Sequence, residues 1–249
     1  MRVHTGWVRA LLDLLLPVEC AGCGAPGPPW CPDCAALLGS PARVYPPCCS
    51  AGPPVYAPPV YALGAYRGRL RTALLAYKEQ GRRDLGGPLG GALAAALLQL
   101  QPGPEPGSRV GGLCLVPVPS RRSAAARRGG QHVALLAQRA AAALAAAGVP
   151  AAVAPALRMA AGVRDSVGLQ AAARQANLAG RVLLRRAGLP PTGTPVVLVD
   201  DVVTTGATAV ACVAALLRAG VDTPAIVALA AAGCHAPSHP QGGKYHSQC

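Results

Sequence analysis

Apolar segments of two kinds alternate along the second half of the chain. Short apolar runs have the length of buried strands, and longer alanine- and leucine-rich segments have the length of helices. The predicted strands are Leu113–Val118, one strand within Val149–Leu157, Val196–Val199 and Ala225–Ala231, and the predicted helices are Gln131–Ala147 and Thr208–Ala219. Strands separated by helices of this length favour an α/β fold, with a parallel sheet covered by helices on both faces.

The first half of the chain has weaker patterns. Trp7–Leu16 predicts a short helix, and Cys20–Pro59 is rich in proline, glycine and cysteine without sustained periodicity. Tyr61–Leu75 predicts a strand followed by a helix, and Ala92–Leu100 predicts a second helix. We therefore divide the chain into three parts: a helix and small cysteine module at 1–59, an α/β domain at 60–232, and a tail at 233–249 that we expect to be disordered.

The charge of the chain is strongly positive. Its 249 residues include 23 lysines and arginines against 10 acidic residues, which gives a net charge of +13. This excess favours phosphate-rich partners, either nucleic acid or small phosphorylated ligands. Because Lys78 and Lys244 are the only lysines, a coding bias toward arginine is the competing explanation.

Ten cysteines raise the question of an oxidising compartment. Leu11–Val18 has the apolar character of a signal peptide, but Asp13 interrupts it and Glu19 stands where cleavage requires a small residue. Ala140–Leu157 lacks charge, but it is mostly alanine, contains Pro150 and Pro155, and is too weakly apolar for a membrane span. We therefore expect a cytoplasmic protein with reduced cysteines and no membrane span.

The clearest functional pattern lies at Val196–Thr208. Four aliphatic residues suit a strand buried on both faces, and Asp200 and Asp201 follow at its carboxyl end, where open α/β sheets bind ligands. A turn with hydroxyl side chains then leads into a helix, whose first backbone N–H groups suit a phosphate. Since carboxylates repel phosphate, the two aspartates should face sugar hydroxyls, directly or through a magnesium ion. The predicted phosphate contacts are Thr204, Thr205, Gly206, Ala207 and Thr208.

Three other interpretations of this segment compete with a sugar-phosphate site. An apolar run followed by two acids also occurs in nucleotide triphosphatases, but neither lysine of this chain lies in the G-x-x-x-x-G-K-[ST] loop that those proteins need. A dinucleotide site is disfavoured because no G-x-G-x-x-G follows a strand. An ordinary turn between strand and helix, with aspartate and threonine as caps, is the remaining alternative.

A basic segment follows the strand at Leu113–Val118. It contains Arg121, Arg122, Arg127 and Arg128, at the carboxyl end of a strand and before a helix. These arginines could clamp a pyrophosphate group or contact a nucleic-acid backbone, and a solvated basic loop is the alternative. We interpret His132 as a polar residue at the start of the helix.

Two C-x-x-C pairs lie in the cysteine module. Cys20 and Cys23 form the first pair, and Cys31 and Cys34 form the second. Two thiolates with this spacing can bind one metal ion together, so the four residues predict a structural zinc site with no open position for catalysis. Reduced cysteines without a metal are the alternative.

The segment at Val196–Thr208 is similar to the phosphoribosyl pyrophosphate (PRPP) signature of type I phosphoribosyltransferases. The resemblance implies that Asp200 and Asp201 contact the ribose hydroxyls and that Thr204 to Thr208 wrap the 5′-phosphate. Purine-salvage members often have an aspartate at the position of Thr204, so the resemblance does not imply purine salvage.

Nearly the whole chain resembles the ComF family of competence-associated, phosphoribosyltransferase-like proteins. That resemblance implies a type I phosphoribosyltransferase-like sheet with a small N-terminal four-cysteine zinc module, and a role in natural transformation with single-stranded DNA and a helicase-like partner. The residues that carry it are Cys20–Cys34, Tyr66 to Lys78-Glu79, Pro117-Val118-Pro119, Arg128-Gly129, Gly168-Leu169, Arg174, Asn177 and the phosphate loop.

Two functions follow from these observations. The first is a phosphoribosyltransferase that binds PRPP with magnesium and transfers ribose 5-phosphate to an acceptor. The second is a DNA-uptake factor that binds single-stranded DNA and has a non-catalytic phosphoribosyltransferase pocket. No side chain stands out as a general base, so the catalytic residues and the acceptor are left unassigned.

Overall fold

The computed structural model describes residues 18–46, 58–100, 112–120, 131–160 and 181–233. Several sequence predictions fall outside these residues: the helix at Trp7–Leu16, the arginines at 121–128 and the tail from residue 234 onward. Among the helices that are described, none has both the length and the apolar character needed to cross a bilayer.

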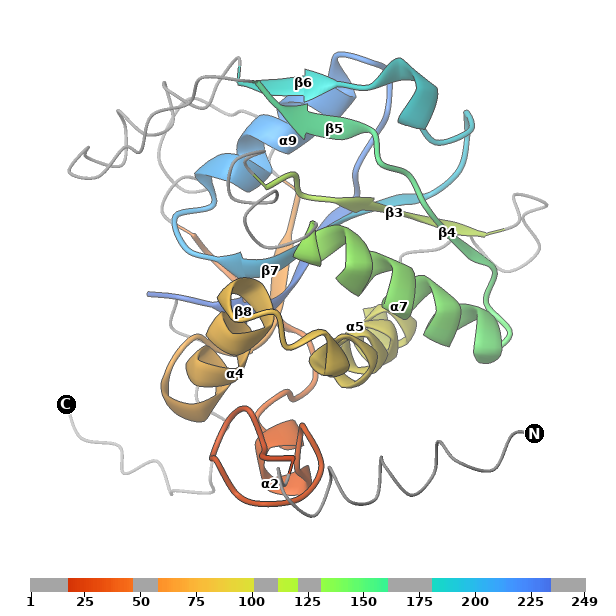
Figure 1. Ribbon diagram of the computed structural model, residues 1–249. Coiled ribbons are helices and arrows are strands. Elements are labelled where there is room, and N and C mark those ends of the chain that lie inside the picture. The colour runs from red at the N-terminus through yellow and green to blue at the C-terminus, as the bar shows by residue number, and fades with distance from the viewer. Residues whose placement is uncertain (1–17, 47–57, 101–111, 121–130, 161–180, 234–249) are drawn as a thin grey trace, which may run out of the picture.

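Within the described residues, the largest element is a six-stranded sheet with the order β1-β2-β8-β7-β3-β4 (Figure 1). β1 pairs antiparallel with β2, and the other neighbours are parallel. The carboxyl ends of β2, β8, β7 and β3 therefore meet at one edge of the sheet. The bounds are β1 Ala42–Val44, β2 Val60–Ala65, β3 Leu113–Pro117, β4 Ala151–Val153, β7 Val196–Val203 and β8 Ala225–Ala231.

Both faces of this sheet are covered. One face packs against α4, α5 and α7, and the other packs against α9 and a small antiparallel pair, β5 and β6. The short helices are α2 (Pro32–Ala35), η1 (Arg83–Leu85) and η2 (Arg186–Gly188). The remaining bounds are α4 Gly68–Glu79, α5 Gly86–Leu100, α7 His132–Ala146, α9 Ala207–Leu217, β5 Leu157–Met159 and β6 Val182–Leu184.

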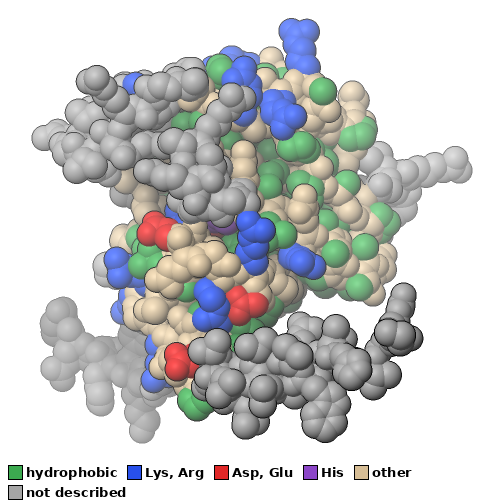
Figure 2. Space-filling model, viewed as in Figure 1, with side chains coloured by type: hydrophobic (Ala, Val, Ile, Leu, Met, Phe, Trp, Pro, Cys, Tyr) green, Lys and Arg blue, Asp and Glu red, His purple; other side chains and the backbone are tan. Residues whose placement is uncertain are grey.

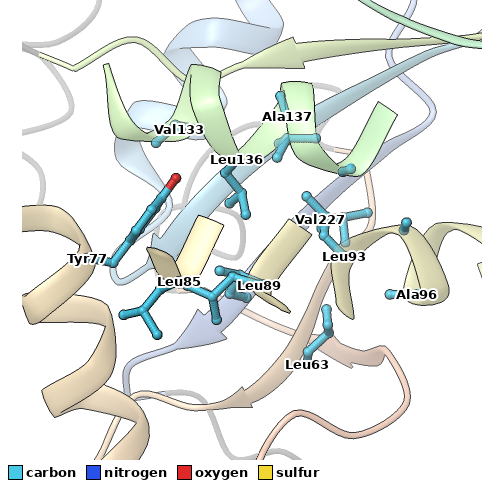
Figure 3. Close-up of a cluster of buried hydrophobic side chains, with 14 of the residues drawn as sticks. Leu63, Tyr77, Leu85, Leu89, Leu93, Ala96, Val133, Leu136, Ala137 and Val227 are labelled. Carbon is cyan, nitrogen blue, oxygen red and sulfur yellow. The ribbon is translucent and has the colours of Figure 1, made fainter. Parts of the chain in front are cut away.

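The core between the sheet and α5 and α7 is built from leucine, valine and alanine, since the chain has no phenylalanine. Figure 3 shows Leu89 and Leu93 of α5 beside Leu136 of α7, with Val227 of β8 behind them. Each of these leucines is fully buried, and burial of one such side chain contributes about 1.5–3 kcal/mol.

The predicted fold class is confirmed: the protein is a mixed α/β protein with a mostly parallel sheet flanked by helices. The phosphoribosyltransferase-like type and the domain boundaries stay predictions. β1 lies within residues 1–59, which we assigned to the cysteine module, and it pairs with β2 of the main sheet. The sheet therefore extends into that part of the chain.

Several elements differ from their predicted bounds. β7 runs to Val203 instead of ending at Val199, so both aspartates lie inside the strand. α5 begins at Gly86 and not at Ala92. The glycines of 86–91 have low helix propensity, but here they form the first turns of α5 because the helix packs closely on α7. At Gly90 the approach is so close that an added Cβ would lie 2.5 Å from Cβ of Arg139. The strand predicted within Val149–Leu157 is β4, and a second strand, β5, begins at Leu157 after Pro155.

Candidate functional site: a phosphate loop and a buried aspartate pair

The loop after β7 has the geometry of a small anion site. Gly206 has φ 80° and ψ −4°, a left-handed conformation that glycine adopts without strain, and α9 begins at the next residue. The turn brings strand and helix together around a small polar pocket. The pocket is lined by Asp200, Val202, Val203, Thr204, Thr205, Gly206, Ala207, Thr208 and Ala209.

The start of α9 offers unpaired donors to this pocket. No side chain caps the helix from Gly206, and its first turn has no acidic residue. The one side-chain contact in the turn is weak: the N–H of Ala207 donates to Oγ1 of Thr205 at 3.4 Å. Free N–H groups and the positive end of the helix dipole together favour an anion at this position. All five predicted phosphate contacts line the pocket, and their role stays a prediction.

The two aspartates have different surroundings, because successive residues of a strand point to opposite faces. Asp200 lines the pocket beside α9. Asp201 points to the other face, where its Oδ2 lies 2.9 Å from Nε2 of His132 on α7 and 3.4 Å from Nζ of Lys78 on α4. Oδ1 of Asp201 accepts a hydrogen bond from the N–H of Val202 at 2.9 Å.

Their pKa values shift in opposite directions. Burial, and then the negative charge of Asp201, raise the pKa of Asp200 well above its ordinary value. Burial acts in the same direction on Asp201, but the hydrogen bond from His132 and the charge of Lys78 outweigh it and lower the pKa of Asp201. The negative charge of the pair therefore rests on Asp201, and Asp200 takes up a proton first as the pH falls.

His132 is the residue that sequence reasoning missed. It begins α7, as its assignment to a helix start implies, but it is also buried against Asp201. The O–H of Tyr77 donates to the carbonyl oxygen of His132 at 2.9 Å, and the two rings meet edge to face. The sequence offered one signal for this contact, the alternation of side chains along a strand. Alternation places Asp201 on the face opposite Asp200, and a carboxylate buried there needs a hydrogen-bond donor.

The predicted pyrophosphate arginines at 121, 122, 127 and 128 lie outside the described residues. The strand that precedes them is described: β3 pairs with β7, and Pro117 lies opposite Val199. Ser120 follows at the same edge of the sheet, and its Oγ is buried without a hydrogen-bond partner in the described part of the chain.

The four cysteines of the two C-x-x-C pairs lie together. Their sulfur atoms are all within 4.8 Å of one another, and the sulfurs of Cys23 and Cys31 are 3.7 Å apart. Four thiolates around one zinc ion, at about 2.3 Å each, are separated by roughly 3.8 Å, so the group can hold a metal ion of that kind. The thiols differ: burial raises the pKa of Cys20, but backbone N–H groups of Cys31, Cys23 and Gly22 outweigh it and lower the pKa to about 6. Burial raises the pKa of Cys34 well above its usual range, so Cys20 becomes a thiolate before Cys34 does.

The cysteine cluster is held against the α/β core. Cys20, Trp30 and Cys34 belong to the same buried cluster as the side chains of α4 and α5. Arg82 links the two parts, because its Nη2 donates to the carbonyl oxygen of Glu19 at 3.0 Å while its guanidinium pairs with Asp84. The module is therefore a packed part of the molecule.

No known family model matches the chain, and the search against curated proteins gave no significant match.

Proposed function

We propose that this chain is a phosphoribosyltransferase-like protein of the ComF type, which binds PRPP or a related ribose 5-phosphate at the pocket between β7 and α9. The observation that carries the proposal is the loop itself. A buried strand, a left-handed glycine and an uncapped helix start together surround a pocket that a phosphate group suits.

The proposed orientation of the ligand follows from charge. The 5′-phosphate lies on the N–H groups of Gly206 to Thr208, at the helix end of the pocket, and the ribose extends over the end of β7 toward Asp200. Asp200 is the carboxylate that would hold a magnesium ion, because it lines the pocket and a divalent cation favours its ionised form. Magnesium would supply charge stabilisation to a pyrophosphate group.

Calorimetric titration with PRPP tests this proposal, in the presence and absence of magnesium. We expect magnesium-dependent binding by the wild type, weakened at least tenfold by Asp200→Asn. Asp222→Asn is the matched control, since it removes the same charge from the loop at the other end of the sheet and should leave the affinity unchanged. Absence of PRPP binding by the folded wild-type protein would refute the proposal.

The cysteine cluster is proposed to hold a structural zinc ion. Cys34→Ser should abolish zinc binding, measured as about one metal per chain, and should lower the melting temperature because the site holds the module together. Cys114→Ala changes a buried cysteine outside the cluster and should leave the metal content unchanged. A full complement of zinc in Cys34→Ser would contradict this assignment.

A second candidate function is binding of single-stranded DNA, as a competence factor would require. Two arginine–tyrosine stacks favour it: the Arg43 guanidinium lies 5.4 Å from the ring centroid of Tyr45, and that of Arg71 lies 5.9 Å from that of Tyr66. Tyr45 is two-thirds exposed, and Figure 2 shows lysine and arginine side chains at several places on the visible face, with few acidic ones. An exposed aromatic ring beside a cation, as at Tyr45, suits a stacked base next to a phosphate backbone, whereas Tyr66 is partly buried against the core.

Fluorescence anisotropy with labelled oligothymidine, at two salt concentrations, separates this candidate from general basicity. Tyr45→Ala should weaken binding several-fold, since base stacking on one ring contributes about 1–3 kcal/mol. Arg71→Ala should also weaken binding several-fold, because it removes the cation beside the Tyr66 ring. Arg186→Ala removes an exposed arginine from η2 and is the charge-matched control. Equal loss in all three variants would indicate non-specific attraction and would refute this candidate.

A further inference from the structure

A second hollow lies at the amino ends of β7 and β8, at the edge of the sheet opposite the phosphate pocket. It is formed by residues 189–196, which lead into β7, and by residues of the turn between α9 and β8. Its volume is about 400 Å³, within the range of small-molecule sites, whereas that of the phosphate pocket is about 40 Å³. The hollow is separate from the proposed sugar-phosphate site, and its own lining decides what it can bind.

Few backbone N–H donors are free in this lining. The prolines at 190, 191, 195 and 224 have no N–H group, and their rings provide rigid apolar walls. Other lining residues donate their N–H groups to carbonyl oxygens of the protein; these are Leu189, Thr194, Ala219, Gly220 and Val221. An anion such as phosphate needs several donors, as the free start of α9 offers at the other pocket. A lining so poor in donors suits instead a ligand that donates hydrogen bonds.

The charge of the lining is negative. Among the described residues that line the hollow, only Asp222 is charged. Its Oδ1 accepts the N–H of Thr223 at 2.9 Å, which orients the carboxylate and leaves Oδ2 for a ligand. α9 ends at Leu217 and the turn that follows lines the hollow, so the negative end of the helix dipole adds to the charge of Asp222. Arg218 is exposed but does not line the hollow. Both features therefore favour a cation.

The net charge of +13 does not prevent this, because charges more than about 8 Å away are largely screened at physiological salt. A cation in the hollow responds mainly to the two negative groups that line it. Two such groups, separated by apolar walls, match two ammonium groups joined by an aliphatic stem better than they match a single ammonium group.

We infer that this hollow is a binding site for a small aliphatic diamine or polyamine. One ammonium group pairs with the carboxylate of Asp222, the stem lies against the prolines, and a second ammonium group meets the carbonyl oxygens at the carboxyl end of α9. The inference is independent of the proposed function, since the two sites lie at opposite edges of the sheet.

The probe is putrescine, an aliphatic diamine, titrated by calorimetry into the full chain at pH 7.5 and low salt. Butane-1,4-diol has the same stem without charge, and n-butylamine has one ammonium group, as a lysine side chain does. Asp222→Asn removes the charge and keeps an oxygen for the N–H of Thr223. Asp33→Asn is the matched control, because it removes the same charge from α2, which lies at the opposite end of the molecule from α9 (Figure 1). Thr192→Arg places a cation at an exposed position of the lining.

The wild type should bind putrescine at least tenfold more tightly than n-butylamine and should not bind butane-1,4-diol at the same concentrations. Asp222→Asn should weaken putrescine binding about tenfold, Thr192→Arg should abolish it, and Asp33→Asn should leave it unchanged. In hydrogen exchange, putrescine should protect peptides that cover 189–196 and 219–224 and leave those that cover 200–210 unchanged.

A wild type that does not bind putrescine would overturn the inference. Equal affinities for putrescine and n-butylamine would also overturn it, because they would indicate a site for a single amine, such as a lysine side chain of a partner. Equal losses in Asp222→Asn and Asp33→Asn would show general attraction to the carboxylates of the chain and would have the same consequence. PRPP binding is measured separately, so each of these results leaves the proposed function intact.

Discussion

Replacing each of the two neighbouring aspartates by asparagine should change the stability of the ligand-free protein in opposite directions. Asp200 is a buried carboxyl whose charge is opposed by burial and by Asp201, and its Oδ1 accepts the N–H of Asp201 at 2.9 Å. Asparagine keeps that acceptor and removes the charge. We expect Asp200→Asn to raise the free energy of unfolding by about 1–2 kcal/mol, the usual size of a single stabilising change.

Asp201→Asn should act the other way. It weakens a buried, charge-assisted hydrogen bond to His132, which contributes about 1.5–3 kcal/mol. The ion pair with Lys78 adds little, because the lysine side chain is 34% exposed and solvent screens the pair. The expected net loss is about 2 kcal/mol. For a chain of this size these changes shift the melting temperature by roughly 4 °C, upward for Asp200→Asn and downward for Asp201→Asn.

Urea denaturation followed by circular dichroism at pH 7.5, without added magnesium, measures both differences. A carboxyl with a raised folded-state pKa favours the folded state below its unfolded pKa of about 3.9, and that contribution is lost as the pH rises through the folded pKa. The advantage of Asp200→Asn should therefore fade toward pH 4. Asp201, with a lowered pKa, contributes above about pH 3.9 and loses that contribution as the pH falls further. Equal destabilisation by both substitutions at pH 7.5 would refute this reasoning.

Two further predictions use paired glycines. Gly206→Ala and Gly220→Ala each place alanine in a left-handed conformation, at a cost of roughly 1–2 kcal/mol in stability. Gly206→Ala alone should also weaken PRPP binding, by about tenfold as measured by calorimetry. Equal PRPP affinities of the two variants would count against the loop as the phosphate site. In α5, Gly90→Ala should lower the free energy of unfolding by about 1–3 kcal/mol because the new Cβ meets Arg139. Gly91→Ala has open space around it and should raise the free energy of unfolding by about 0.5–1 kcal/mol. Urea denaturation measures both changes, and equal effects would contradict the packing of α5 on α7.

The elements that carry strong local signals were predictable from the sequence. The aliphatic run of β7, the glycine turn and the start of α9 follow each other within one segment, so their order and location needed no long-range information. The clustering of four cysteines was likewise implied by the spacing of two C-x-x-C pairs. β1 was missed because a three-residue edge strand has too few positions to show alternation, and it forms by pairing with β2.

The environment of the aspartates could be predicted only in part. The predicted strand ends at Val199, which makes both aspartates loop residues that face one ligand. Had the strand been continued, its alternation would have separated Asp200 from Asp201. Which donors meet Asp201 could not be deduced, because His132 is 69 residues away along the chain and Lys78 comes from a third element.

Hydrogen exchange of the backbone amides, measured by mass spectrometry with and without PRPP, locates the bound phosphate. The proposed site predicts protection of peptides that cover residues 200–210, where the N–H groups at the start of α9 would bond the phosphate. Peptides that cover 189–196, which line a separate hollow at the opposite end of β7, should exchange at the same rate in both samples. Protection at 189–196 without any change at 200–210 would contradict the phosphate loop as the ligand site.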